Sequence, residues 1–594
     1  MRVTKKIIIF ATLTFCSIEF TCTPYYIYSM LQIRCKNNNI TKSFPEGTSL
    51  LDVYQEYAEE LQMPYPVVAA KVNNTPQGLK FRLYQNRDVE FLDAREGSGH
   101  RIYVRSLCFV LYKATQDLFS GSKLFIEHSI SRGYYCNFKK RVAERGAKSE
   151  ELTVEDIDRI RERMQEIINL DMPFRRNEAT TEEAVRIFAE RGFTDKVKLL
   201  ETSGQIYSDY YILGDTVDYY YGALVPSAGY LTVWGLEPYH DGMLLRVPDW
   251  YNPTVLAEKV DMPKTYEMFA EKTHWDIIMR LSNAGDVNKA IIKGHASELI
   301  QVSEALQEKK IVQIAEEIDR RAHNKENPVK LVLITGPSSS GKTTFCKRLS
   351  VQLLACGLRP LSFSTDDYFV NRVDTPKLPN GDYDFDNIET VDYHLLEDHL
   401  VRLMKGERVE VPEYNFVTGQ REWNGKKLKL SNDSVLIIEG IHALNPLLTK
   451  EISDRSKFKI YISALTSISL DDHNWIPVRD NRLLRRIIRD YNKGAYTAQQ
   501  TISQWKNVCD AEDKWIFPFQ ETADVMFNSA LNIEFAVLRT HAELILSSVP
   551  KNCPEYSEAH RLLKFIHFFI PVSDKEIPPT SIMREFVGGS SFKY

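Results

Sequence analysis

Apolar and polar positions along the first part of the chain follow short strand-like and helix-like patterns. Residues 31–35 place an apolar side chain at every second position, which predicts a half-buried strand. A second strand is expected near 41–44, after an asparagine-rich turn. Leu50, Val53 and Tyr57 share one face of a helix that follows a Pro-Glu-Gly-Thr-Ser turn. With two further short strands, this pattern predicts a small α/β unit.

The rest of the chain shows longer periodic segments. Helical periodicity predicts helices over 101–119, 153–168 and 298–322, and Ser297 is the expected N-cap of the last one. From residue 328 to 549, apolar strands alternate with helices, which is typical of a parallel sheet covered on both faces. Sequence patterning therefore predicts an α/β back part behind a mixed front part.

Composition narrows the class of protein. The 594 residues carry a formal net charge of -5, which argues against a globally basic nucleic-acid binder. Nine cysteines occur without a Cys-x-x-Cys pair, so neither a zinc site nor a disulfide framework is indicated. This usage fits reduced thiols in a cytoplasmic protein.

The first 29 residues form a separate question. Two lysines precede an apolar run over 7–16, as in a secretory leader, but Glu19 follows soon and no small-residue cleavage site is present. Met30 directly precedes the first strand, so 1–29 is either a leader or anchor, or a mis-annotated start. Apart from this region, no segment has the 18 or so apolar residues of a membrane span, so we expect no membrane association.

One stretch carries a specific chemical signal. The strand 330–335 runs directly into Gly-x-x-x-x-Gly-Lys-Thr, and a helical pattern follows. In that context, consecutive backbone N–H groups and the helix N-terminus bind phosphates. Lys342 is expected to reach the β- and γ-phosphates, and Thr343 to hold Mg²⁺. ATP and Mg²⁺ are therefore expected, bound by Gly336, Pro337, Ser338, Ser339, Ser340, Gly341, Lys342, Thr343 and Thr344.

Two carboxylates follow apolar strands in the same region. Asp366 comes after the strand at 361–365, and Glu439 ends the strand at 435–439. The carboxyl ends of parallel strands meet at one edge of the sheet, where ligands bind. Asp366 is therefore a candidate base or Mg²⁺ ligand, and Glu439 a candidate Mg²⁺ ligand.

A dense set of arginines occurs on one helical segment. Arg482, Arg485, Arg486 and Arg489 lie on adjoining faces of that helix. A solvated basic face is the usual explanation of such a run. The phosphate loop in the same region favours phosphate contact instead, because guanidinium groups bind phosphate in a bidentate way.

These motifs, taken in order, resemble the uridine kinase and phosphoribulokinase family of P-loop kinases. The matching segments are GPSSSGKT, TDDYF, YDFDNIETVD, and IIEG followed by RLLRRIIRD. The resemblance implies that Asp366 is the catalytic base and that Asp386 binds ribose hydroxyls. It also implies that Arg485 approaches the sugar, while Arg486 and Arg489 act with Lys342 on the transferring phosphoryl group.

The resemblance also extends to the base-contacting segment of uridine kinases. Tyr414 and Phe416 supply the aromatic surface, but Gly419 stands where that family has a histidine. The missing imidazole removes a hydrogen-bonding partner for a pyrimidine, so uridine itself is not settled. The segment 466–478, before the arginine helix, has no counterpart in the family.

The front half resembles a different family. Residues 31–93 resemble a TGS domain, a β-grasp module that generally binds RNA or regulatory ligands. Residues 96–260 resemble the editing domain of threonyl- and alanyl-tRNA synthetases, which uses one His-x-x-x-His pair and one Cys-x-x-x-His pair. The corresponding positions here are Arg105, Phe109, Tyr220 and Leu224. These residues are poor zinc ligands, so neither zinc nor deacylation is expected.

The tyrosines at 219–221 have two interpretations. They either stack on an RNA base or pack within a sheet, and packing is favoured.

The combined prediction is an ATP-dependent kinase that phosphorylates the 5′-hydroxyl of a nucleoside. The alternative is a regulatory P-loop NTPase that binds RNA or tRNA through the front half. The resemblance is compatible with a homo-oligomer of unspecified number. The predicted parts are 1–29 (leader or mis-annotated start), 31–93 (β-grasp, TGS-like), 96–260 (α+β, editing-like), 261–327 (helical connector), 328–549 (α/β P-loop kinase) and 550–594 (C-terminal tail).

Overall fold

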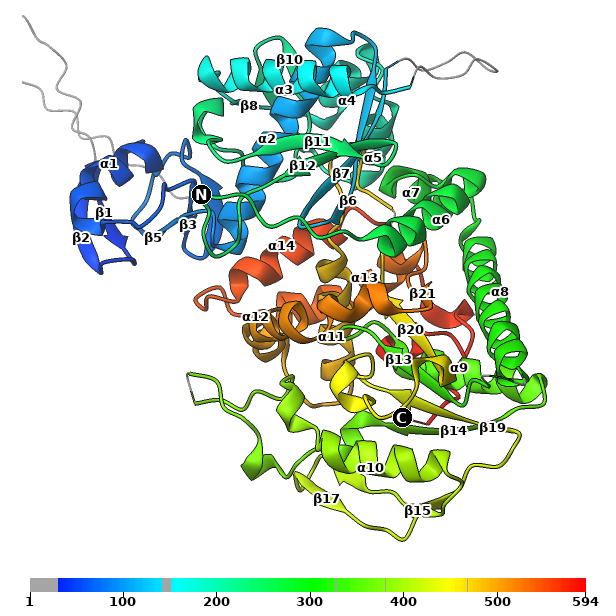
Figure 1. The fold of residues 1–594 in the computed structure, drawn as a ribbon. Helices are drawn as coiled ribbons and strands as arrows, with labels where there is room; N and C mark the ends of the chain where they lie inside the picture. Colours follow the sequence, from blue (N-terminus) through cyan, green and yellow to red (C-terminus); the bar gives the residue numbers. More distant parts are fainter. Residues whose placement is uncertain are drawn as a thin grey trace, which may run out of the picture.

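A computed structural model describes residues 30–140 and 151–593, apart from positions 325, 327, 380 and 467 (Figure 1). The predicted leader at 1–29 lies outside these described residues. Within them, no helix is both long enough and apolar enough to cross a membrane.

The N-terminal unit is a five-stranded sheet in the order β2-β1-β5-β3-β4 with one helix packed against it. Helix α1 begins where predicted because Ser49 and Asp52 form a reciprocal capping box. Leu50, Val53 and Tyr57 are buried, which confirms the predicted face. The elements are β1 (Met30–Cys35), β2 (Ile40–Pro45), α1 (Leu50–Leu61), β3 (Ala69–Val72), β4 (Thr75–Gly78) and β5 (Arg87–Leu92).

The next unit joins two antiparallel sheets to the long helix α2 (Gly97–Leu118). Tyr219 and Tyr220 are buried in apolar clusters, in agreement with the packing interpretation. The sheets have the orders β11-β12-β7-β6 and β10-β9-β8. The other elements are β6 (Lys123–Ile130), β7 (Gly133–Lys139), α3 (Val154–Asn169), β8 (Arg175–Thr180), α4 (Thr181–Glu190), α5 (Thr194–Ser203), β9 (Tyr207–Leu213), β10 (Thr216–Asp218), η1 (Ala228–Tyr230), β11 (Gly235–Tyr239) and β12 (Gly242–Arg246).

Three helices connect this unit to the back part: α6 (Pro263–Met279), α7 (Ala284–Ile292) and α8 (Ala296–Ala322). The predicted cap of α8 is wrong, because the helix begins at Ala296, two residues earlier than predicted, and Ser297 lies inside it. Ile311, Ile314 and Ile318 of α8 are buried against the back part.

The back part contains a five-stranded sheet whose paired strands are all parallel, in the order β14-β19-β13-β20-β21. Its strands are β13 (Leu331–Thr335), β14 (Arg359–Ser364), β19 (Ser434–Glu439), β20 (Lys457–Ser463) and β21 (Val525–Asn528). Helix α9 (Lys342–Ala355) follows β13, and α8 packs beside α9. The main helices after α9 are α10 (Tyr393–Met404), α11 (Val478–Asn492), α12 (Ala498–Trp515), α13 (Glu534–Ser547), α14 (Tyr556–Ile566) and α15 (Arg584–Val587).

The largest core joins segments that are distant in sequence. Residues from α5, α7, α11, α13 and α14 pack in one apolar cluster. Helix α14 lies between the front part and α12, and contacts both β4 and α12 (Figure 1). Apolar burial is the main stabilising contribution in such a cluster. The front and back parts therefore share a core.

A loop before α11 strengthens this connection. Asp471 lies in the segment 468–477, and Asp218 lies in the front part. Each has a carboxylate oxygen 3.0 Å from the ammonium of Lys196. His473 Nδ1 lies 2.7 Å from a carboxylate oxygen of Asp218. The backbone also participates, because Ile126 N–H donates to the Asp472 carbonyl at 2.8 Å.

Candidate functional site

The glycine-rich loop connects β13 to α9 and has the backbone shape that its sequence predicts. Gly341 precedes α9 with φ +85°, a left-handed conformation that glycine adopts without a Cβ penalty. Lys342 Nζ makes no hydrogen bond or ion pair with the part of the chain that the structure describes. The buried hydroxyls of Ser339 and Ser340 are also unpartnered among the described residues. Unused cationic and hydroxyl groups at such a loop fit an anionic ligand.

Strand register brings the two predicted carboxylates to this loop. Glu439 is paired with Ile334 on one side and with Ser364 on the other. The phosphate loop starts two residues after Ile334, and Asp366 follows two residues after Ser364. The carboxyl ends of three adjacent parallel strands therefore place Lys342, Asp366 and Glu439 at one edge of the sheet.

The electrostatics agree with this placement. The pKa of Glu439 is raised to about 7, mainly by burial, with Lys342 opposing the rise and the Asp366 charge adding to it. Burial also raises the pKa of Asp366 above its ordinary value, again against Lys342. Two carboxyls and one lysine thus share a single electrostatic environment, which is typical of functional sites.

The oxygen ligands at this edge fit a magnesium ion. Thr343 Oγ1 lies 3.3 Å from Glu439 Oε1, and the buried Glu439 Oε2 has no hydrogen-bond partner among the described residues. Mg²⁺ prefers oxygen ligands and usually binds one or two carboxylates together with substrate phosphates. Thr343 and Glu439 are therefore suited to hold it.

The arginine helix α11 contacts the loop, but not as the sequence predicted. Arg486 donates to Ser338 Oγ at 3.1 Å, as expected of a phosphate-side residue. Arg489 pairs with Asp490 at 3.0 Å. The predicted sugar contact of Arg485 does not fit, because its guanidinium is fully buried and donates to Glu534 at 2.7 Å and to the Ser339 carbonyl at 3.3 Å.

Arg482 also supports the loop from behind. Its guanidinium is buried, and it donates to the Ser338 carbonyl at 3.1 Å and to Glu512 Oε2 at 2.8 Å. Glu512 Oε1 in turn accepts the Ser338 N–H at 3.0 Å. The sequence contained no signal for Glu512 or Glu534, since each becomes a partner only through the packing of α12 and α13 against α11.

An aromatic surface lies beyond Asp366. The rings of Phe369 and Tyr414 are 5.5 Å apart, and those of Tyr414 and Phe416 are 5.1 Å apart. Gly419 has φ +70°, and a Cβ built there would lie 2.8 Å from the Arg372 side chain. Arg372 therefore fills the space beside Gly419, the position at which uridine kinases have a histidine.

Asp386 and one unpredicted histidine lie near the same lysine. Burial raises the pKa of Asp386 to about 6, while Arg486 opposes the rise. His442 is 1% exposed, and neither ring nitrogen has a hydrogen-bond partner among the described residues. Burial lowers its pKa to about 4, so the ring is neutral at neutral pH. A neutral, unsatisfied imidazole next to this site is a residue that motif reading missed.

The front half brings its four predicted positions together without metal-binding chemistry. The rings of Phe109 and Tyr220 are 5.5 Å apart, and both pack with Leu224 in one apolar cluster. Arg105 donates to the Ala223 carbonyl at 2.9 Å. Aromatic and aliphatic side chains thus occupy the place that the resemblance assigns to zinc ligands.

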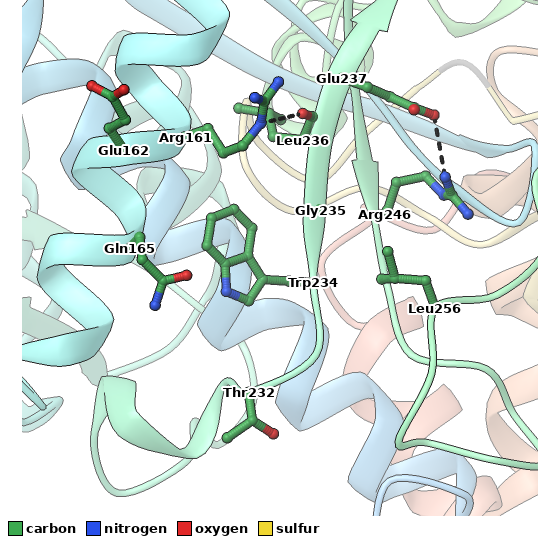
Figure 2. Close-up of a pocket in the computed structure, with 10 residues that line it drawn as sticks. All are labelled: Arg161, Glu162, Gln165, Thr232, Trp234, Gly235, Leu236, Glu237, Arg246 and Leu256. Atoms are coloured by element: carbon green, nitrogen blue, oxygen red, sulfur yellow. Dashed lines mark hydrogen bonds and ion pairs between the residues drawn. The ribbon is translucent and has the colours of Figure 1, made fainter.

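The front half also contains an open cavity of about 400 Å³ between α3 and β11 (Figure 2). Trp234 faces the cavity from β11's side, and Arg161 and Gln165 line it from α3. Arg161 is already engaged, because its Nε donates to the Leu236 carbonyl at 2.9 Å. The cavity is separate from the phosphate loop.

Comparison with known proteins agrees with the geometry of the back part. A model described as the phosphoribulokinase/uridine kinase family matches residues 331–534. The uridine kinase of Mycoplasma genitalium is 32% identical over 178 residues, which cover 30% of this chain and 74% of that protein. This chain belongs to the phosphoribulokinase/uridine kinase family. Family membership makes the back part a P-loop kinase and implies ATP as its phosphoryl donor.

Other similarities concern parts of this family member. The threonine–tRNA ligase of Syntrophomonas wolfei is 31% identical over 204 residues, in the N-terminal part of this chain. That match covers 34% of this chain but only 30% of the ligase, so the chain spans under a third of that relative. A solved structure titled a possible uridine kinase from Bacillus stearothermophilus is 20% identical, with a TM-score of 0.26, over 37% of this chain and 98% of that one.

Proposed function

We propose that this kinase transfers the γ-phosphoryl group of ATP to the 5′-hydroxyl of a nucleoside, with Mg²⁺ as cofactor. The observation that supports this most strongly is the strand register that brings Glu439 beside both the phosphate loop and the strand before Asp366. In phosphoryl transfer, positioning and charge stabilisation supply most of the catalysis. A base next to a phosphate cradle is the arrangement that such transfer requires.

Each group has a defined task in this proposal. Asp366 accepts the proton of the attacking hydroxyl, because its raised pKa makes it a better base than an exposed aspartate. Lys342 and Arg486 stabilise the charge on the transferring group. Mg²⁺, held by Thr343 and Glu439, supplies further charge neutralisation when bound. Arg489 reaches the phosphates only if it leaves Asp490.

The acceptor is proposed to lie over the aromatic surface. Tyr414 and Phe416 offer ring faces for a nucleobase, and Asp386 accepts hydrogen bonds from the hydroxyls of the sugar. Arg372 adds donors on this side, since it lies against Gly419. A base with carbonyl oxygens on its edge would match those donors.

The experiment is a product assay with purified chain, ATP, Mg²⁺ and a panel of nucleosides. The proposal predicts a nucleoside 5′-monophosphate, identified by mass and by comparison with the 2′- and 3′-isomers. ATP consumption without any phosphorylated nucleoside would contradict it.

A second candidate, an RNA-regulated P-loop NTPase, is favoured by the similarity of the front half to threonine–tRNA ligases. It predicts that tRNA stimulates hydrolysis of ATP to free phosphate, with or without nucleoside. The same assay with tRNA in place of nucleoside separates the two proposals.

A further inference from the structure

The C-terminal segment lies against the phosphate-binding loop. Glu585, on the short helix α15, accepts hydrogen bonds from Thr344 Oγ1 at 2.6 Å and from Thr344 N–H at 3.3 Å. Ile582 touches the same loop, because a Cβ built on Gly341 would lie 2.4 Å from Ile582 Cγ2. The end of the chain therefore contacts both the second glycine of the loop and the first turn of α9.

The Thr344 N–H is one of the groups with which a helix N-terminus binds anions. The first i→i−4 bond of α9 is the one that Phe345 N–H donates to the Gly341 carbonyl, so the N–H groups before it have no acceptor within the helix. These donors attract anions, as does the positive end of the helix dipole. The Glu585 carboxylate therefore occupies a position suited to a phosphate oxygen of a bound nucleotide.

Further contacts hold the segment in this place. The Arg485 guanidinium lies 4.8 Å from the centre of the Phe586 ring, and Asn492 Nδ2 donates to the Phe586 carbonyl at 3.1 Å. Arg584 donates to Asp574, three residues before the segment 577–588, at 2.9 Å. Ile582 and Phe586 are buried against the core that covers α9. The segment is thus packed between α9 and α11, the two helices that carry the phosphate-side residues.

The charge of Glu585 also affects Glu439, the proposed metal ligand. Burial and Asp366 raise the pKa of Glu439, and Glu585 adds to that rise. A triphosphate would bring further negative charge to the same place. Two anions that compete for one N–H group in a partly buried site repel each other strongly.

We propose that the segment 577–588 is an autoinhibitory strap whose Glu585 carboxylate occupies the anion position at the start of α9. A nucleoside triphosphate binds fully only when Glu585 has left Thr344. This inference deepens the proposed function, but it requires only that the loop binds a triphosphate, and it does not depend on which alcohol is phosphorylated.

The test is ATP affinity in matched variants of the full chain, measured by calorimetry with Mg²⁺. Glu585→Gln removes the charge and keeps the size of the side chain, while Glu576→Gln makes the same change at an exposed position directly before the strap. Glu585→Gln is expected to tighten ATP binding by about tenfold, which corresponds to about 1.4 kcal/mol. Glu576→Gln is expected to leave the affinity unchanged. Unchanged or weaker binding by Glu585→Gln would overturn the proposal.

A second measurement covers the case in which Glu585→Gln disturbs folding. Hydrogen exchange of the wild-type chain reports on the Phe586 and Gly588 amides, which donate to the Met583 and Arg584 carbonyls. ATP is expected to accelerate their exchange because the strap is released, and slower exchange would contradict release. ATP binding with strap release but without nucleoside phosphorylation would reject the proposed function alone.

Discussion

At the scale of single residues, Asp366 shows how position in the fold determines chemistry. Its place after a strand could be predicted from the sequence, because parallel strands end at a common edge. The shift of its pKa could be known only from the structure, since it depends on burial and on the charge of Lys342, which belongs to a different strand–helix unit. The raised pKa is thus a property of the assembled site.

Replacing Asp366 by Asn removes the proposed base with little change in size. We expect kcat to fall by about 100- to 10,000-fold, the usual contribution of a general base. ATP affinity, measured by calorimetry, is expected to change little. Asp367→Asn is the matched control, because Asp367 caps the Ser364 N–H and an amide oxygen can still accept that bond. Equal activity of wild type and Asp366→Asn would reject the assignment.

The raised pKa of Glu439 predicts a pH dependence of magnesium use. Without a bound metal, the pKa of the Glu439 carboxyl is about 7, and Mg²⁺ binds only the deprotonated form. Apparent Mg²⁺ affinity in the kinase assay is therefore expected to weaken by up to about tenfold per pH unit below that value. The effect of pH on folding stability has the opposite direction. Because the pKa of Glu439 is raised in the folded protein, this carboxyl stabilises the folded, metal-free chain at low pH, and the stabilisation is lost as the pH rises through about 7. A magnesium requirement that is constant from about pH 6 to about pH 8 would contradict the assignment.

The role of Arg485 could not be predicted from the sequence alone. Its spacing on α11 fits a phosphate or sugar contact equally well, but its partner Glu534 lies 49 residues further along the chain. A pairing of that kind depends on how α11 packs against α13. The sequence identified the arginine as important without revealing that its task is to support the loop.

At the scale of elements, periodicity and capping signals predicted several helices and strands of the described chain. Helix α3 starts after Thr153 through a capping box, as expected, whereas α8 begins without a side-chain cap. The segment 468–477 had no predicted structure because its contacts are with another part of the chain. Its polar residues find partners only when it docks on the front half.

Substitution of Lys196 tests how much this docking contributes to the stability of the fold. Its ammonium is fully buried and lies 3.0 Å from both Asp218 and Asp471. Lys196→Met leaves buried carboxylates unpaired, which typically costs about 3–5 kcal/mol in the free energy of unfolding. Lys198→Met, on the same helix, removes a partly exposed pair with Asp286 and is expected to cost below about 1 kcal/mol. Urea unfolding of both variants measures the difference, and equal costs would show that the docking contributes little.

At the scale of the whole molecule, the predicted boundaries do not separate independent cores. The cluster that includes Leu484 of α11 and Phe565 of α14 also contains Leu199 of the front half. Sequence patterning detects elements and motifs, but it does not reveal which apolar faces meet across several hundred residues. The close connection between the front half and the kinase part is therefore visible only in the structure.

The shared core predicts that the fragment 328–549 does not fold stably alone. It lacks α7 and α14, so apolar faces of α11 and α13 would be exposed to water. We expect aggregation or a broad, weakly cooperative thermal transition by circular dichroism, in contrast to the chain 30–594. A sharp transition at the temperature of the longer chain would show that the interface is dispensable.

The most direct test of the central claim follows the fate of the terminal phosphoryl group. The chain is incubated with ATP labelled in its γ-phosphoryl group, Mg²⁺ and a nucleoside, and the label is traced by chromatography. The account predicts label in the nucleoside 5′-monophosphate with wild type and its near-complete loss with Asp366→Asn. Label that appears only in inorganic phosphate, in equal amounts for both proteins, would contradict it.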